Sequence, residues 1–205
     1  MTPTRQHLQP RKQPLQQRSQ RTRQRILDAA ARVFADHGYA AGTTNRIAER
    51  ADLSIGSLYQ YFPNKDAILV ELMTAHLNAG IAITKNHFAA GLPDSLEDTL
   101  RLFVRATIDN HRDAPRLHRV LFEEAPRPPE ILRLLHESET DIVTTTQVVL
   151  AAHPDVGVAD TDTAARLVVA AIESLVHRLI ASPTPIAVAP FEDELVAMLT
   201  RYLTG

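Results

Sequence analysis

Hydrophobic residues recur at intervals of three and four along most of the chain, a spacing typical of one face of an α-helix. The first stripe lies in residues 19–37, where Ile26, Ala30 and Phe34 fall about one turn apart and Gly38 follows the end of the segment. No segment shows the convincing alternation of polar and apolar residues that marks a half-buried β-strand. The pattern therefore predicts an all-α protein.

Glycines and prolines divide the chain into the remaining helices. Two short helical patterns lie at residues 43–51 and 54–62. We expect the later helices at residues 64–87, 95–112, a short one from 115, 130–152, 161–181 and a last one ending near 203. Together with the first helix, these make about nine.

The two short helices and the turn between them read as a helix-turn-helix. Thr43 and Ser54 can each cap a helix by accepting a backbone N–H, and the turn falls at Asp52 and Leu53. The residues that the spacing places on the buried side are Ile47, Ala48, Ala51, Leu58 and Phe62.

The side chains that the second short helix leaves outward suit a DNA groove. Gln60 can donate and accept at a base edge, Ser57 can bond a base or a phosphate, and Ile55 can pack on a thymine methyl. Gly56 lets the backbone approach closely. The candidates for phosphate contacts are Tyr59, Tyr61 and Lys65. From spacing alone, a small helical hairpin with structural tyrosines is the alternative.

Residues 22–72 resemble the N-terminal domain of the TetR family of transcriptional regulators. The matching elements, in the order and spacing of the family, are Ile26-Leu27, Ala29-Ala30, Phe34, Gly38, Thr43-Thr44, Ile47-Ala48, Ser54, Gly56, Leu58-Tyr59, Tyr61-Phe62 and Lys65. One departure is Asp52, where the family usually has glycine. Because Asp enters the left-handed region more easily than most residues, we expect the turn to form.

The resemblance implies that Thr44 and Tyr59 contact phosphate, that Asn45 reaches a base, and that Lys65 holds a flanking phosphate. The resemblance does not imply which bases these residues read. The expected DNA-binding residues are Thr43, Thr44, Asn45, Ser54, Ile55, Gly56, Ser57, Tyr59, Gln60, Tyr61 and Lys65.

The helix at residues 161–181 is apolar nearly all round, so it must be buried nearly all round. We expect this helix, the last helix and their symmetry mates to form a homodimer, as the resemblance also implies. The expected interface residues are Leu167, Val168, Ala171, Ile172, Leu175, Leu179, Leu195 and Leu199. Such a dimer would place two recognition helices about 34–36 Å apart on a palindromic operator. A monomer with a well-buried central helix is the alternative.

The resemblance further implies a small-molecule effector in the C-terminal domain. An apolar or amphipathic ligand is expected, because few inward charges are available to hold an anion. The candidate pocket residues are polar groups and apolar neighbours on the middle helices: Phe103, Thr107, His111, Ser138, Ile142 and His177. For each of them alone, an ordinary place in the core or on the surface is the more frequent explanation.

Charge is distributed unevenly along the chain, although its formal net value is only −2. Residues 1–25 hold seven Lys or Arg and no acid, and residues 1–18 lack apolar periodicity, so we expect a disordered basic arm there. It can contact DNA or be merely a solvated tail. We expect no signal peptide and no membrane span, and the absence of cysteine fits a cytoplasmic protein.

An enzyme is not expected, because the chain lacks a nucleophile elbow, a phosphate-binding loop and any HExxH motif. Glu173 and His177 share a helix face and are expected to contact each other at i,i+4 spacing. His111 and His118 straddle Pro115, so no regular helix aligns them. We therefore expect neither a metal site nor a cofactor.

These observations predict four regions: the basic arm at 1–18, a helix-turn-helix domain at 19–65, a linking helix at 66–90, and a ligand-binding and dimerisation domain at 91–205. The expected function is that of a DNA-binding repressor released by its ligand. The alternatives are an activator, a co-repressor-dependent regulator or, in another class, a helical-bundle enzyme or lipid-binding module.

Overall fold

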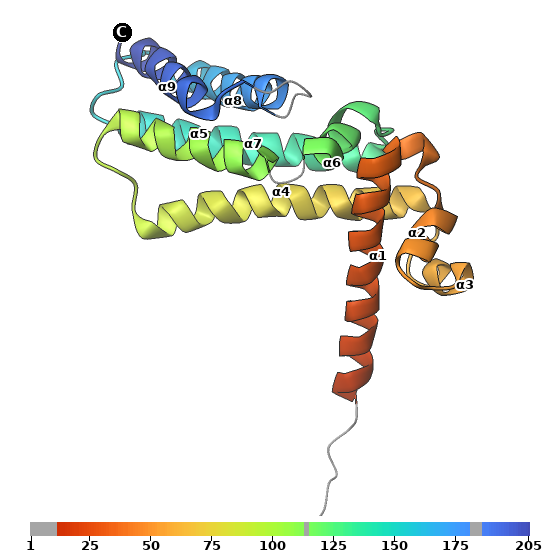
Figure 1. The fold of residues 1–205 in the computed structure, drawn as a ribbon. Coiled ribbons are helices and arrows are strands. Elements are labelled where there is room, and N and C mark those ends of the chain that lie inside the picture. Colours follow the sequence, from red (N-terminus) through yellow and green to blue (C-terminus); the bar gives the residue numbers. More distant parts are fainter. Residues whose placement is uncertain (1–11, 113–114, 181–185) are drawn as a thin grey trace, which may run out of the picture. The chain divides into compact units, whose positions relative to one another are not determined.

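The computed structural model describes residues 12–112, 115–180 and 186–205 (Figure 1). Every regular element in these ranges is a helix, which confirms the all-α prediction. The chain divides into two compact units, residues 1–68 and 69–205.

The first unit contains α1 (Lys12–Ala41), α2 (Thr44–Arg50), α3 (Ile55–Tyr59) and the start of α4 (Lys65–Ala90). Helix α1 begins earlier than the apolar stripe predicted, so the part of the expected disordered arm that follows residue 11 is helical. Arg and Gln have high helix propensity, which extends the helix beyond its buried face. The rest of the arm, residues 1–11, lies outside the described residues.

The core of this unit is built from the stripes that the sequence predicted. Ile26, Phe34, Ile47 and Leu58 are fully buried, and Phe62 is nearly so. Gly42, which joins α1 to α2, is fixed by close packing, because a Cβ there would lie 2.7 Å from Cε1 of the Phe34 ring.

The second unit contains the rest of α4 together with α5 (Leu96–Arg112), α6 (Pro115–Arg119), α7 (Pro129–Ala152), α8 (Thr161–Leu179) and α9 (Val188–Thr204). Helix α8 packs against α5, α7 and α9, and α5 also packs along α9 (Figure 1). A π-helical turn at Val120–Glu124 follows α6, and the sequence pattern did not predict it. The nine predicted helices are present in the described part of the chain.

Four of the residues predicted for the dimer interface belong to the core of their own chain. Val168, Ile172, Leu195 and Leu199 are only 2–6% exposed and lie in the cluster formed by α5, α7, α8 and α9. The apolar circumference of α8 is wide because three helices of the same chain cover one side of it. The prediction was therefore wrong for these four residues.

Helix α4 is long and apolar enough to cross a membrane when only length and composition are considered, and few of its residues are buried within the chain. Charged side chains interrupt it at Asp66, Glu71 and Lys85.

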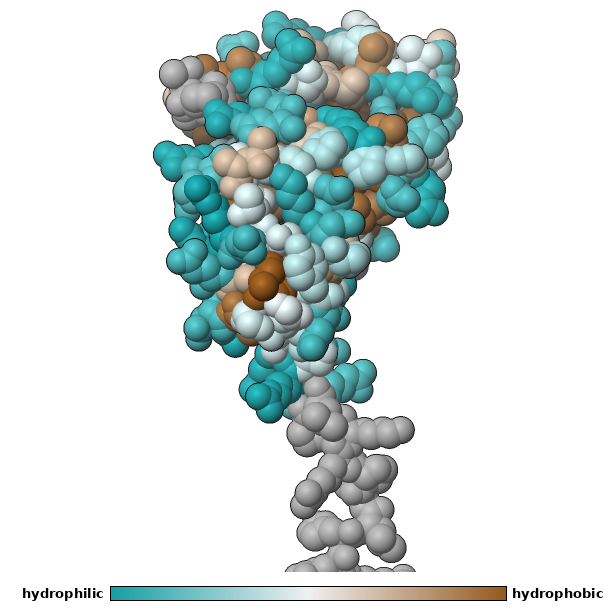
Figure 2. Space-filling view, turned by 90° about the vertical axis from the view of Figure 1, so that its right-hand side faces the viewer, coloured by the Kyte–Doolittle hydropathy of each residue, from teal (hydrophilic) through white to brown (hydrophobic). Residues whose placement is uncertain are grey.

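On the face drawn in Figure 2, hydrophilic residues cover most of the surface and hydrophobic residues form separate smaller patches.

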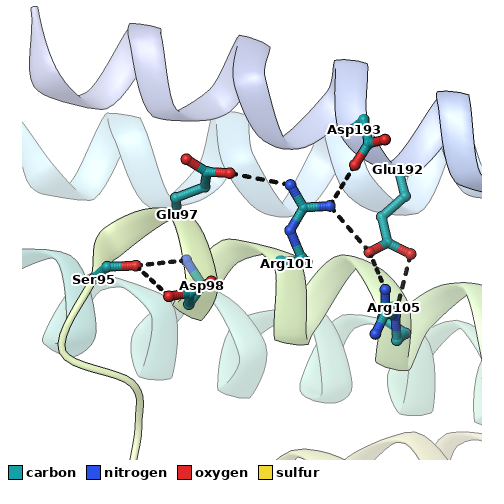
Figure 3. A network of polar contacts seen from close by, with 7 residues as sticks. All are labelled: Ser95, Glu97, Asp98, Arg101, Arg105, Glu192 and Asp193. Carbon is teal, nitrogen blue, oxygen red and sulfur yellow. Dashed lines mark hydrogen bonds and ion pairs between the residues drawn. The ribbon is translucent and has the colours of Figure 1, made fainter.

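Helices α5 and α9 are joined by a cluster of ion pairs (Figure 3). The Glu192 side chain is only 6% exposed, and its Oε1 accepts hydrogen bonds from Arg105 at 2.6 Å and Arg101 at 3.3 Å. Arg101 also pairs with Asp193 at 2.6 Å and Glu97 at 3.1 Å, and these hydrogen bonds raise the pKa of its guanidinium. A buried carboxylate is stable only with such partners.

Replacing this carboxylate should destabilise the second unit. We expect Glu192→Ala to lower the free energy of unfolding by about 2 kcal/mol, because charge-assisted hydrogen bonds of a buried group are lost. The control is Glu194→Ala on the same helix, whose side chain is exposed and which should change stability by less than about 0.5 kcal/mol. Urea denaturation measures both, and equal effects would contradict the assignment.

Candidate nucleic-acid interface

The two short helices begin at the caps that the sequence predicted. Thr43 Oγ1 accepts the backbone N–H of Arg46 at 3.3 Å, and Ser54 Oγ accepts that of Ser57 at 3.1 Å. The hydroxyls of Ser54 and Ser57 are also hydrogen-bonded to each other at 2.8 Å. Ser54 is therefore occupied in starting α3.

The turn between α2 and α3 contains the one described non-glycine residue with a positive φ. Asp52 has φ 53°, and its N–H donates to Glu49 O at 3.0 Å while Leu53 N–H donates to Ala48 O at 2.9 Å. These two bonds form a Schellman motif with Asp52 at the left-handed position. The expectation that the turn survives without glycine is confirmed.

Helix α1 holds this turn from the other side. A guanidinium nitrogen of Arg25 donates to the carbonyl oxygen of Ala51 at 2.5 Å and lies 3.4 Å from that of Asp52. The charge of Arg25 meets the carbonyl end of α2, where a helix dipole favours a cation. The angle between the two short helices is thus fixed by the first helix as well as by the turn.

The outward face of α3 is open to solvent. Ile55 is 37% exposed and Tyr59 50% exposed, and Gly56 and Gln60 are exposed as well. Leu58 and Phe62 point into the core, as predicted. Ser57 and Tyr61, which the sequence placed on the same outward face, are half-buried.

Two of the expected phosphate ligands converge although they come from different helices. The hydroxyl of Thr44, at the start of α2, lies 3.2 Å from that of Tyr59, at the end of α3. Both groups can turn their protons toward a common acceptor. A single phosphate oxygen can therefore be bound by both hydroxyls. Thr43 and Asn45 flank this pair and are exposed.

Lys65 is used differently from what the resemblance implied. Its ammonium donates to the carbonyl oxygens of Tyr39 at 2.9 Å and Ala40 at 3.3 Å, and it lies 4.1 Å from the centre of the Tyr39 ring. The Tyr39 hydroxyl bonds the Asp66 carboxylate, and burial together with that bond raises the pKa of Tyr39. In this conformation Lys65 stabilises the end of α1, and the first turn of α4 is capped by Asn64, whose Oδ1 accepts the N–H of Ala67 at 2.8 Å.

The glycine in α3 has no structural requirement within the protein. The atom nearest to a Cβ on Gly56 would be Ser54 Oγ, at 4.0 Å. The φ angle of Gly56 is not positive. Glycine in a helix costs about 1 kcal/mol relative to alanine. A glycine on an open helical face is therefore explained best by close approach of another molecule.

Arg46 was missed by the sequence analysis. It is exposed on α2 beside Asn45, and it makes no ion pair within the described part of the chain. The other arginine of α2, Arg50, pairs with Asp36 at 3.0 Å. A cation with no acidic partner beside the two hydroxyls would add attraction for a nucleic acid. The sequence signal that could have pointed to Arg46 is that no acidic residue lies four positions after it.

The predicted effector residues line neither of the two cavities described in the second unit. A cavity of about 230 Å³ in the second unit is bounded by Leu72, Ala75, His76, Asn110, Leu117, His118 and Leu121, and another by residues of α4 and α5. None of the six predicted residues lines either cavity. Ser138 is buried, Ile142 packs on the core, Phe103 contacts Phe88, and Thr107 bonds the backbone of its own helix.

The remaining two candidates, His111 and His177, belong to a cluster of histidines. The sequence analysis had not expected His111 to meet His118, because Pro115 lies between them. The rings of His111 and His118 are only 4.2 Å apart, because α6 starts anew at Pro115 and returns His118 to the side of α5. The predicted contact of Glu173 with His177 is not among those described. Glu173 lies instead 3.6 Å from His111, and His177 bonds Glu123 at 2.9 Å.

The first unit thus has the geometry of a helix-turn-helix DNA-binding domain. Comparison with protein families matches residues 26–72 to the "Bacterial regulatory proteins, tetR family" model and residues 95–203 to a "Tetracyclin repressor-like, C-terminal domain" model. The second match covers more than half of the chain. The chain belongs to the TetR family of transcriptional regulators.

Individual relatives agree with this classification. The chain is 37% identical over 68 residues to the transcriptional repressor KstR of Mycobacterium tuberculosis, which is 33% of this chain and 31% of the relative. It is 29% identical over 124 residues to the transcriptional activator FasR of Mycolicibacterium smegmatis, 60% of this chain and 48% of the relative. The matched segments thus span about a third to a half of these two curated relatives.

Solved structures show the same fold over nearly the whole chain. A tetR-family regulatory protein from Rhodococcus RHA1 has a TM-score of 0.70 at 23% identity, over 89% of this chain and 96% of that chain. The ketosteroid regulator KstR2 of Mycobacterium tuberculosis has a TM-score of 0.67 at 18% identity, over 89% and 95%.

The close packing around Gly42 predicts that adding a side chain there strongly destabilises the first unit. We expect Gly42→Ala to destabilise it by about 1–3 kcal/mol, because the new methyl overlaps the buried Phe34 ring. Thermal unfolding followed by circular dichroism measures the change. Gly80→Ala is the control, since a Cβ there meets only Asn110 Nδ2, at 3.5 Å. A Gly42→Ala protein as stable as Gly80→Ala would contradict the packing.

Proposed function

We propose that this protein is a cytoplasmic, sequence-specific DNA-binding repressor that acts as a homodimer and is released from its operator by a small molecule. The observation that supports DNA binding most strongly is the exposed face of α3, where Ile55, Gly56 and Gln60 stand open beside the Thr44–Tyr59 hydroxyl pair. Base-reading groups and phosphate-binding groups adjoin each other there, as a protein that enters a major groove requires.

Each of these groups would have its own role at the operator. The amide of Gln60 can bond a base edge, and Ile55 can pack on a thymine methyl. Thr44 and Tyr59 bind a backbone phosphate and fix the depth at which α3 enters the groove. The half-buried Tyr61 and Ser57 lie at the edge of the proposed contact between α3 and DNA. Arg46 adds electrostatic attraction to DNA that weakens as the salt concentration rises.

An apolar stripe on α8 and α9 supports the dimer. Leu167 is 50% exposed and Leu179 36% exposed, and the half-buried Ala171 and Leu175 lie between them at intervals of one turn. On α9, Met198 and Tyr202 are 44% and 41% exposed and lie one turn apart. The sequence analysis had not listed these last two. Large exposed apolar residues in register on neighbouring helices favour contact with a second copy.

The 230 Å³ cavity supports a small effector. Its walls are mainly apolar, from Leu72, Ala75, Leu117 and Leu121, and His76, Asn110 and His118 add polar groups. Such a lining suits an apolar or amphipathic molecule. The names of relatives that regulate ketosteroid or fatty-acid genes point in the same direction. Binding would favour one conformer of α4, a continuous helix that begins at Lys65.

An activator is the second candidate, and the likeness to FasR, which is named an activator, is the observation that favours it. Both candidates bind DNA through the same face of α3. A reporter gene behind the operator separates them, because a repressor lowers expression and an activator raises it.

Gly56 gives the sharpest test of DNA binding. We expect Gly56→Ala to fold normally, with stability unchanged or raised by up to about 1 kcal/mol, because the space around its Cβ is open and alanine favours a helix. Its affinity for the operator should nevertheless fall at least tenfold, about 1.4 kcal/mol, because the methyl stands where DNA approaches.

Fluorescence anisotropy on operator DNA at fixed salt, with thermal unfolding in parallel, measures both properties. The control is Gly80→Ala, which lies outside the proposed DNA-binding face and should leave operator affinity unchanged. Full affinity in Gly56→Ala would exclude close contact at this helix.

The apolar stripe predicts which substitutions separate the dimer. We expect Leu167→Glu with Leu179→Glu to yield monomers in sedimentation velocity, because two charges would be buried at the contact. Specific DNA affinity should fall with dimerisation. The matched control is Leu132→Glu on α7, whose side chain is equally exposed at 51% and lies outside the stripe. If the double variant sediments like the Leu132→Glu protein, the stripe is not the interface.

A further inference from the structure

Four histidines from four different helices meet inside the second unit. His76 comes from α4, His111 from α5, His118 from α6 and His177 from α8. The His118 ring lies 5.1 Å from that of His76, 4.2 Å from that of His111 and 4.9 Å from that of His177. His111 and His118 are only 4% exposed. Buried histidines are rarely gathered in this way without a function.

When His177 is neutral, its hydrogen bonds determine which nitrogen of His118 carries a lone pair. Glu123 accepts the Nε2–H of His177 at 2.9 Å, so the Nδ1 of His177 is left as an acceptor. His118 Nδ1 lies 3.2 Å from that acceptor and therefore donates its proton there. The Nε2 of His118 is then unprotonated, and it is buried with no hydrogen-bond partner among the described groups.

His111 and His76 present lone pairs in the same way. The Nδ1–H of His111 donates to Thr107 O at 2.8 Å, which leaves its Nε2 unprotonated. His76 Nε2 lies 3.4 Å from the amide nitrogen of Asn110, a donor, and so is also an acceptor.

An acidic side chain completes the cluster. Glu173 Oε2 lies 3.6 Å from His111 Nε2. With His111 in the tautomer that Thr107 fixes, its Nε2 lone pair faces the carboxylate of Glu173. A cation between the two atoms would be attracted by both.

We propose that His76, His111 and His118 bind a divalent transition-metal ion of the zinc type, with Glu173 as the fourth ligand. One ligand atom of each histidine lies within 4.8 Å of those of the other two. Zinc–nitrogen bonds of about 2.0–2.1 Å in tetrahedral geometry place ligand atoms about 3.4 Å apart. The Glu173–His111 distance of 3.6 Å is close to this value. The histidine nitrogens, which lie within 4.8 Å of one another, would approach by up to about 1.4 Å through broad χ2 rotations.

The surroundings have the features of a second coordination shell. Thr107 O orients His111, and the chain from Glu123 through His177 orients His118. Such partners fix the tautomer of a ligating histidine and raise its basicity. The 230 Å³ cavity, which His76 and His118 help to line, provides a path by which the ion can enter. This site involves only the second unit and does not depend on the proposed DNA-binding function.

The test is equilibrium dialysis of the full chain, without a histidine tag, against ZnCl₂ at pH 7.5, followed by metal analysis. Visible absorption after CoCl₂ addition reports the ligand geometry. We expect one ion per chain and the intense d–d bands of four-coordinate cobalt. No binding of either ion at micromolar concentration would overturn the proposal.

The main variant is His118→Phe, which keeps the ring stacked on Phe122, 4.3 Å away between ring centres, and removes the ligand nitrogen. It should fold at least as stably without metal, because a buried unpaired nitrogen is lost. Loss of outer-shell partners weakens metal binding about 10–100-fold, so loss of a ligand should weaken it at least about 100-fold. Unchanged zinc affinity in His118→Phe would refute the site.

Two further variants locate the ion. His136→Phe, an exposed histidine on α7, should bind zinc as the wild type does, and its loss of binding would place the ion elsewhere. Glu173→Gln should weaken zinc and alter the cobalt spectrum while the histidines still bind. Wild-type affinity and spectrum in that variant would remove Glu173 from the ligand set.

Discussion

The position of the proposed DNA-reading helix depends on one backbone constraint, the left-handed residue between α2 and α3. Asp52 at φ 53° lets the chain reverse within a few residues, and the N–H groups of Asp52 and Leu53 satisfy the last carbonyls of α2. Arg25 holds the same turn from α1. Because Leu58 and Phe62 then fall into the core, the opposite side of α3 must face outward.

The sequence predicted this unit well because its signals are local. Caps at Thr43 and Ser54, a turn residue that tolerates positive φ, and apolar residues at helical spacing each act within a few positions. The all-α fold, the helix order and the buried stripes follow from such signals. The start of α1 did not, since helix propensity carried the helix past its buried face.

Contacts between distant segments explain what the sequence missed. The helices that bury Val168 and Leu199 come from the same chain, and an apolar pattern does not tell an intrachain partner from a second copy. The histidine cluster joins residues from four helices, and its members carry no shared spacing along the sequence. Lys65 could not be foreseen as a partner of α1, since the carbonyls of Tyr39 and Ala40 that it binds lie far from it in the sequence. Within one helix, the absence of a contact between Glu173 and His177 shows that partners elsewhere outcompete an i,i+4 pair.

The central claim, a dimer that reads DNA sequence through α3, is tested most directly by selecting genomic fragments with the purified protein at moderate salt and sequencing those that bind. We expect enrichment of an inverted repeat whose half-sites are centred about one helical turn apart, about 10 base pairs. Uniform recovery of all fragments that disappears as salt rises would contradict it, because attraction to phosphates alone would then explain the binding.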